Sequence, residues 1–363
     1  AGKLGRSGCG ARFGCHACQA VMNDRSMDAM VADPRYVHLR PLLRIRDFLA
    51  AIQYDMGRRT WVTRQVETDG RTGRSWLKVQ PHHFDSATLQ TIVGAYMTAD
   101  RDEADRAAAF DAALAEGRTP DDPYLRACAA EGRVPDPAYL RRMRRPQFRV
   151  VDAVKAVALD FYSGVLLTHG KPFTVLELWR RVWHLGESIQ VPSVPRHPPI
   201  PIPAARWVEL PAGRTPSDFL GLADPLVTVW EECWGEGDLH TVAGETAMAV
   251  EAEAFSVDPE AAGLIVDLIY PSDWRQMHEA PEPDPFAPVR AYVTMGAVML
   301  SPAGRTHLNR ILRHRAALAA TGIYALPPAV LYGFAGDRFA DGTGPGLGPC
   351  GLPAGEPQLA LDL

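Results

Sequence analysis

The chain has 363 residues and a mass of 39.7 kDa, enough for one large domain or two of ordinary size. Apolar residues make up 47% and charged residues 22%, which is typical of a globular protein and excludes an intrinsically disordered one. The net charge of −5 excludes a wholly basic nucleic-acid coat protein, although it leaves room for a local basic face. No uncharged apolar stretch reaches the ~20 residues that cross a bilayer, so no membrane segment is predicted.

The sequence predicts a mainly α-helical protein with a small β-hairpin. Prolines and glycines gather in a few places, which suggests linkers and a tail between more regular regions. The predicted parts are a cysteine-rich loop at 1–33, a helical region at 34–191 with a hairpin at 60–80, a Pro-rich linker at 192–203, a second helical region at 204–340, and a flexible tail at 341–363.

The first helical region opens with apolar residues at helical spacing over 34–56. Residues 58–81 are rich in β-branched and aromatic side chains on either side of Asp69-Gly70, which is typical of two strands joined by a turn. A helix is then predicted from Asp85 or Ser86 to Met97, and a separate Ala-rich helix from Asp100 to about Gly117.

Two short helices are predicted next, because Pro120 and Pro137 suit the first turn of a helix. The long apolar stretch 148–169 and the segment 173–185 predict a buried helical hairpin. Beyond the Pro-rich linker, a helix start at Thr215 and a basic helix at 302–320 are expected.

Three of the six cysteines, Cys9, Cys15 and Cys18, fall within ten residues. Two thiolates with two residues between them, such as those of Cys15 and Cys18, can face one metal, and neighbouring glycines leave room for the backbone around it. Four interpretations are open: an iron–sulfur cluster, a zinc site completed by His16 or a distant ligand, a redox pair at Cys15 and Cys18, and a chance grouping. The uneven use of cysteine favours a reducing cytoplasm over a disulfide scaffold, and Cys128, Cys233 and Cys350 are predicted to be inert thiols.

The residues around and after these cysteines resemble the cysteine-rich segment of the phosphoadenosine-phosphosulfate-reductase-like family. The nearest group is the DndC-like sulfur-transfer proteins of bacterial DNA phosphorothioation. That family has an Arg-Phe-Gly-Cys-x-x-Cys loop, then an Asp/Lys-x-Ser-Met-[Glu/Asp]-Ala helix and a Leu/Arg-rich helix. The matching residues are Arg12, Phe13, Gly14, Cys15 and Cys18, then Asp24, Arg25, Ser26, Met27, Asp28 and Ala29, then 42–49.

The resemblance covers about fifty residues and implies a [4Fe–4S] cluster held partly by Cys9, Cys15 and Cys18. It also implies an N-terminal α/β ATP-pyrophosphatase domain of the PP-loop type that adenylylates the target before sulfur enters. The implied partners are DNA or another adenylylated substrate, a sulfur donor such as a cysteine desulfurase, and other modification-system proteins. No Ser-Gly-Gly-Lys-Asp-type loop occurs in the sequence, so the chain is expected to be the C-terminal part of a longer, cytoplasmic enzyme.

Basic residues are concentrated near the cysteines, with eleven Lys or Arg against five acids in residues 1–64. Arg6, Arg12 and Arg25 are therefore candidate phosphate or nucleic-acid contacts, with a solvated helix face as the alternative. A second basic run at 141–149 is predicted to be a solvated helix end.

Two other functions are consistent with the sequence. One is a zinc-stabilised nucleic-acid or protein-interaction module without catalysis. The other is a small-molecule sulfonucleotide reductase. Among the remaining residues, Asp152 and Asp160 are expected to be hydrogen-bonded or helix-edge acids, and the tryptophans at 179, 183, 230 and 234 to pack in a core.

Overall fold

The computed structural model describes residues 25–68, 75–166, 169–200, 206–209, 255–268, 272–301 and 308. Over these residues the chain is mainly helical with two small antiparallel sheets, which confirms the predicted mainly helical class. The chain folds into two compact units, each assembled from segments that are far apart in sequence. None of the helices in these ranges is both long and apolar enough to cross a membrane.

Unit 1 comprises residues 25–54, Thr91–Asp152 and Arg181–Pro198. The predicted helix at 34–56 divides into a 3-10 helix η1 and the α-helix α2, because Pro41 begins a new first turn. The elements are α1 (Arg25–Ala32), η1 (Pro34–Leu39), α2 (Arg40–Ile52), most of α3 (Ser86–Ala115), α4 (Pro123–Ala130), α5 (Pro137–Met143) and most of the π-helix η3 (Arg180–His184).

The prediction of two helices over 85–117 is wrong, because α3 runs without a break through Asp100. Asp100 does not cap a new helix. Its buried carboxylate instead accepts hydrogen bonds from the backbone N–H groups of Val150 and Val151, both at 2.7 Å. One turn further on, the buried Glu103 accepts from the N–H of Gln147 at 2.8 Å. These two buried acids therefore fasten a distant loop onto α3.

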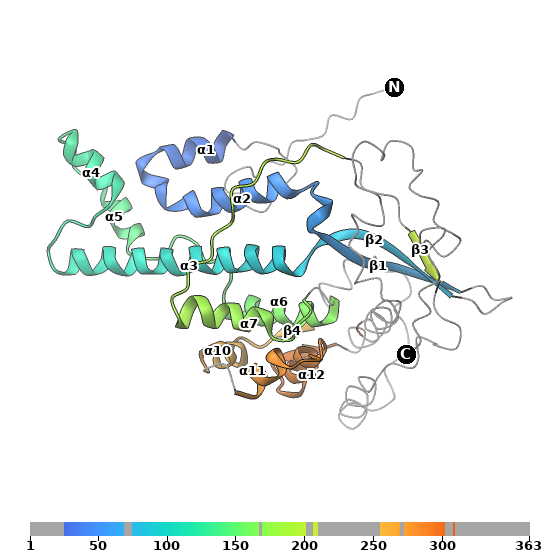
Figure 1. Cartoon of the computed structure of the whole chain (residues 1–363). Helices are drawn as coiled ribbons and strands as arrows, with labels where there is room; N and C mark the ends of the chain where they lie inside the picture. Colours follow the sequence, from blue (N-terminus) through green and yellow to red (C-terminus); the bar gives the residue numbers. More distant parts are fainter. Residues whose placement is uncertain are drawn as a thin grey trace. The chain divides into compact units, whose positions relative to one another are not determined.

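The C-terminal half of α3 packs with α4 and α5 around a small core (Figure 1). The core residues are Phe110, Tyr124, Leu125, Cys128, Tyr139 and Met143. Asp122 and Asp136 cap the two short helices, since their carboxylates accept from backbone N–H groups two or three residues on. The first helix therefore begins at Pro123, three residues after the predicted start, while the second begins at Pro137 as predicted.

Residues 186–198 have no helix or strand but are fastened to unit 1. The N–H of His197 donates to the carbonyl of Ala51, and the N–H of Ile189 donates to the Thr98 hydroxyl, both at 3.0 Å. The Ile189 side chain lies over Gly94, where an added Cβ would be 2.7 Å from Ile189 Cδ1. Gly94 therefore makes room for this segment on α3.

We expect Gly94→Leu to lower the free energy of unfolding of unit 1 by about 1–3 kcal/mol, because the new side chain displaces Ile189. Faster proteolytic cleavage within 186–198 would accompany the loss. Gly263→Leu is the matched control, since a Cβ at this helical glycine of α10 (Pro259–Asp267) meets nothing within 4 Å. Equal effects of the two variants in thermal unfolding would contradict the packing.

Unit 2 contains Asp55–Gln90, Ala153–Arg180 and the described residues after 198. The predicted hairpin is present as β1 (Arg59–Thr68) and β2 (Ser75–Phe84), paired antiparallel. Two register shifts in the ladder mark irregularities at Thr60/Val62 and Thr63/Gln65. A third strand, β3 (Arg206–Glu209), pairs antiparallel with β2, so the prediction that 204–340 is helical is wrong for these residues.

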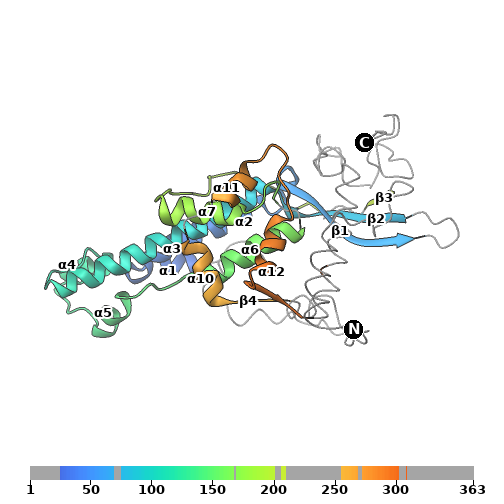
Figure 2. The same cartoon turned by 90° about the horizontal axis from the view of Figure 1, so that it is seen from below.

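Three helices of unit 2, α7 (Thr174–Trp179), α10 and α12 (Ala287–Thr294), pack against α6 (Ala153–Leu166) (Figure 1, Figure 2). The predicted helical hairpin of 148–169 and 173–185 is confirmed, because α7 contacts α6. Its first helix is shorter than predicted, since α6 begins at Ala153. The other elements are α11 (Ser272–Glu279), β4 (Phe255–Val257) and β5 (Val298–Leu300), the strands being paired antiparallel.

Three aromatic rings pack together in the core of unit 2. Phe173 stacks on Trp274 with the ring centroids 4.7 Å apart, and Tyr292 meets both rings edge-on. Phe173 has a positive φ of 56°, a conformation that costs a non-glycine residue free energy and that this packing holds in place. The predicted core role of Trp179 is confirmed by its burial, whereas Trp183, in unit 1, is half-buried beneath the guanidinium of Arg149. Trp230 and Trp234, predicted in the same way, lie outside the described residues.

Candidate functional site

The predicted metal ligands Cys9, Cys15 and Cys18 lie outside the described residues, as do Arg6 and Arg12. Arg25 is the first residue of α1. Within the described part of the chain, no group of three or more His, Cys, Asp or Glu side chains could hold a metal ion.

The helix that follows the cysteines in sequence is α1, and it is anchored in unit 1. Met27 is 1% exposed and Val31 is buried, so this face of α1 belongs to the core, while Asp28 is exposed. The chain from Cys18 to Arg25 spans seven residues, and so at most ~25 Å when fully extended. The Cα of Cys18 therefore lies within that distance of the start of α1, and a metal on its thiolate lies at most a few ångströms further.

Cys128 does not complete the ligand set, because its thiol is fully buried in the core between α3, α4 and α5. It is a free cysteine, in line with the inert thiol predicted for it. Cys233 and Cys350, predicted in the same way, lie outside the described residues.

The second basic run lies at the end of α5 and just beyond it, where its five arginines are exposed. Arg144 pairs with Asp111, and the guanidinium of Arg142 lies over the rings of Tyr36 and Tyr139 at 5.8 and 5.6 Å. These contacts agree with the predicted solvated helix end.

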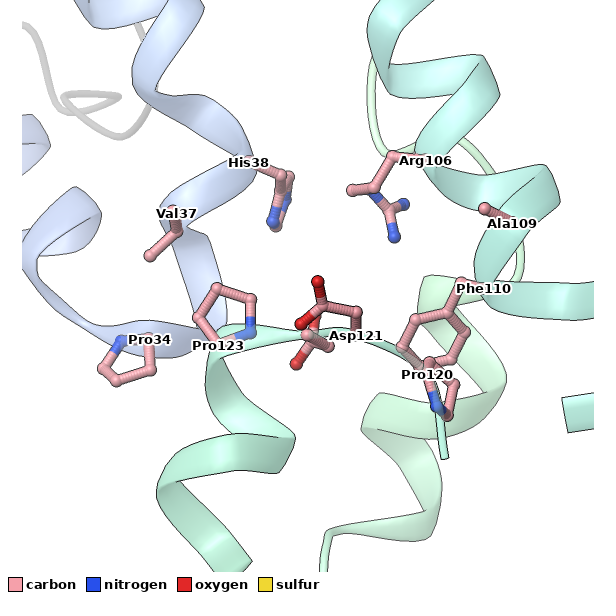
Figure 3. A pocket seen from close by; sticks show the side chains of 10 residues that line it. Pro34, Val37, His38, Arg106, Ala109, Phe110, Pro120, Asp121 and Pro123 are labelled. Carbon is pink, nitrogen blue, oxygen red and sulfur yellow. The ribbon is translucent and has the colours of Figure 1, made fainter. Parts of the chain in front are cut away.

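A cavity of about 400 Å³ lies within unit 1, in the size range of ligand pockets (Figure 3). Its walls come from η1, from the C-terminal half of α3 and from the start of α4. The lining residues are Pro34, Val37, His38, Arg106, Ala109, Phe110, Pro120, Asp121, Asp122 and Pro123. Figure 3 shows His38, Arg106 and Asp121 reaching the same space from three different segments.

Most charges around this cavity are already paired. Arg106 donates from Nε and Nη2 to the two carboxylate oxygens of Glu103, at 2.7 and 2.8 Å. Asp122 accepts from the N–H groups of Tyr124 and Leu125 and from the Tyr139 hydroxyl. This arrangement raises the pKa of Tyr139, because burial and the nearby carboxylate both disfavour its ionised form.

His38 and Asp121 provide the remaining polar groups of the cavity. Burial lowers the pKa of His38, with smaller opposing effects of Glu103 and Asp122 on one side and Arg106 and Arg142 on the other. The imidazole is therefore neutral at pH 7. The Asp121 side chain is 90% exposed and lies 3.6 Å from Arg126, itself 69% exposed.

None of the residues lining this cavity was predicted from the sequence to be functional. The available signal was Asp122-Pro123, a helix cap followed by a first-turn proline, which would have placed two acids beside the end of α3. The contribution of η1 had no such signal, because it depends on the fold of unit 1.

Comparison of the chain with protein-family models, with curated proteins and with solved structures finds no match.

Proposed function

We propose that this chain is the C-terminal part of an ATP-dependent iron–sulfur sulfur-transfer enzyme that resembles the phosphosulfate reductases and acts in DNA phosphorothioation. The observation that carries the proposal is the Cys9-x5-Cys15-x2-Cys18 loop, followed by the Arg25–Ala32 segment that resembles the family. An α/β PP-loop domain would precede it in the full-length enzyme.

The donor set suits the proposed cofactor. Three closely spaced thiolates are soft ligands that fit an iron–sulfur cluster, and Cys128 offers no fourth ligand because it is buried. When bound, a cluster supplies a site at which sulfur can be held or relayed. Met27, in the segment that resembles the family, is buried in unit 1.

The residues of this chain would bind and orient the substrate rather than activate it. Arg6, Arg12 and Arg25 would hold phosphates of DNA or of an adenylylated intermediate close to the cluster. Adenylylation of the target would take place in the PP-loop domain.

The cysteine loop is tested by anaerobic purification of the full chain, followed by an absorption spectrum and iron, sulfide and zinc analysis. We expect a brown protein with a broad band near ~400 nm and matched iron and acid-labile sulfide. The double variant Cys15→Ala/Cys18→Ala should lose the colour and the iron, while Cys128→Ala keeps both. A colourless protein with one zinc would support the interaction module instead, and a protein with neither metal would overturn both.

The upstream reading frame separates the enzyme from the module. A Ser-Gly-Gly-Lys-Asp-type loop in the codons before Ala1 would support the enzyme, and a start codon at that point would contradict it. Binding of adenylyl sulfate without any effect of DNA would favour the small-molecule reductase.

A further inference from the structure

The sulfur-transfer proposal gives no role to the cavity in unit 1. Prolines at 34, 120 and 123, with Val37, Ala109 and Phe110, give it mainly apolar walls, while its polar groups are few and converge (Figure 3). This combination is typical of a site for a small organic molecule.

The cavity offers little to an anion. The guanidinium of Arg106 is held by both oxygens of Glu103 and donates from Nη1 to the carbonyl of Met143 at 3.2 Å. The first N–H groups of α4 are capped by Asp122, so this helix end provides no free donors there. Arg142, which also affects His38, is stacked over Tyr36 and Tyr139.

The cavity wall does, however, carry negative charge that could bind a cation. Within the described part of the chain, the carboxylate of Asp121 makes a single ion pair, a long and solvent-exposed one with Arg126, and such pairs are weak. Asp122 adds a second negative charge at the same wall, beneath the surface. The neutral imidazole of His38 faces them without repelling a cation and offers one donor and one acceptor.

We propose that this cavity binds a small organic cation, a primary ammonium or amidinium with a compact apolar body. The cationic head pairs with Asp121 beside His38, and the body lies against Phe110, Val37 and the prolines. The proposal is independent of the cysteine loop and of sulfur transfer.

The test is calorimetric titration of the full chain at pH 7.5 and low salt with benzamidinium, using benzamide as the neutral isostere and benzoate as the anion. We expect benzamidinium to bind with a Kd below ~1 mM, at least about tenfold more tightly than either control probe. Asp121→Asn should weaken its binding about tenfold or more. Asp105→Asn is the matched control, because Asp105 is an exposed acid of α3 that does not line the cavity.

Ala109→Phe fills the cavity without changing its charge and should abolish binding. Ala109 is an exposed residue of α3, so the variant should keep the thermal unfolding midpoint of the wild type. Should this variant fail to fold, Asp121→Asn carries the test by itself. Equal binding of the three probes, tighter binding of benzoate, or no binding of benzamidinium at ~10 mM would each overturn the proposal.

Discussion

Asp100→Ala is expected to destabilise unit 1 by about 2–4 kcal/mol, because it leaves the N–H groups of Val150 and Val151 without their acceptor. The carboxylate is 2% exposed, so water does not readily replace it. Hydrogen exchange at the amides of residues 150 and 151 should accelerate by about a hundredfold, the factor that corresponds to ~2.7 kcal/mol of local opening.

Asp102→Ala provides the control on the same helix. Its carboxylate is 51% exposed and pairs with the neighbouring Arg101, so its loss should change the free energy of unfolding by less than about 0.5 kcal/mol. If exchange at the amides of 150 and 151 is the same in the two variants, Asp100 does not hold the loop onto α3.

The stability of unit 2 should fall as the pH rises from about 4 to about 6, because of Asp160. Burial raises the pKa of its carboxyl group to about 6, although the Tyr292 hydroxyl and the N–H of Val175 partly offset this by hydrogen bonding to the charged form. A carboxyl group whose pKa is raised on folding binds its proton more tightly in the folded state. Its stabilising contribution is therefore complete below the unfolded value of 3.8 and is lost as the pH passes the folded value.

Tyr292→Phe should cost about 1.5–3 kcal/mol at pH 7, since it removes a hydrogen bond to a buried, ionised carboxylate. At pH 4.5 Asp160 is protonated in the folded state, and the cost should fall to about 1 kcal/mol. Thermal unfolding at pH 4.5, 6 and 7.5 measures both effects.

Asp160→Asn separates titration from packing. The amide retains a hydrogen-bonding group of similar size between Val175 and Tyr292, but it does not titrate, so the fall in stability between pH 4 and 6 should disappear. If the pH dependence persists in Asp160→Asn, or if Tyr292→Phe costs the same at both pH values, another group is responsible.

The elements that were predicted correctly have local causes. The hairpin follows from β-branched strands around a turn, and α5 follows from an aspartate cap and a first-turn proline, Asp136 and Pro137. The core role of Trp179 follows from apolar spacing. In each case the determining residues are within a few positions of one another.

The errors have long-range causes. Asp100 was predicted to start a new helix because aspartate is a common helix cap, but the partners of its carboxylate lie fifty residues away. The sequence also gives no sign that His197, in the predicted Pro-rich linker at 192–203, bonds to Ala51, or that Ile189, just before that linker, rests on Gly94. The pairing of β3 with β2 likewise joins segments more than a hundred residues apart.

The candidate sites divide in the same way. The predicted ligand set Cys9, Cys15 and Cys18 and the proposed resemblance to a sulfur-transfer family rest on the sequence, because ligand spacing is a local property of the chain. The cavity comes from the tertiary structure alone, because η1, α3 and the start of α4 form its walls only after they pack. The sequence by itself determined the helix and hairpin content, since caps and periodicity act over a few residues, and the cysteine ligand set is a prediction from spacing. Tertiary packing decided which acids became buried acceptors and where a pocket opened, since burial depends on neighbours distant in sequence.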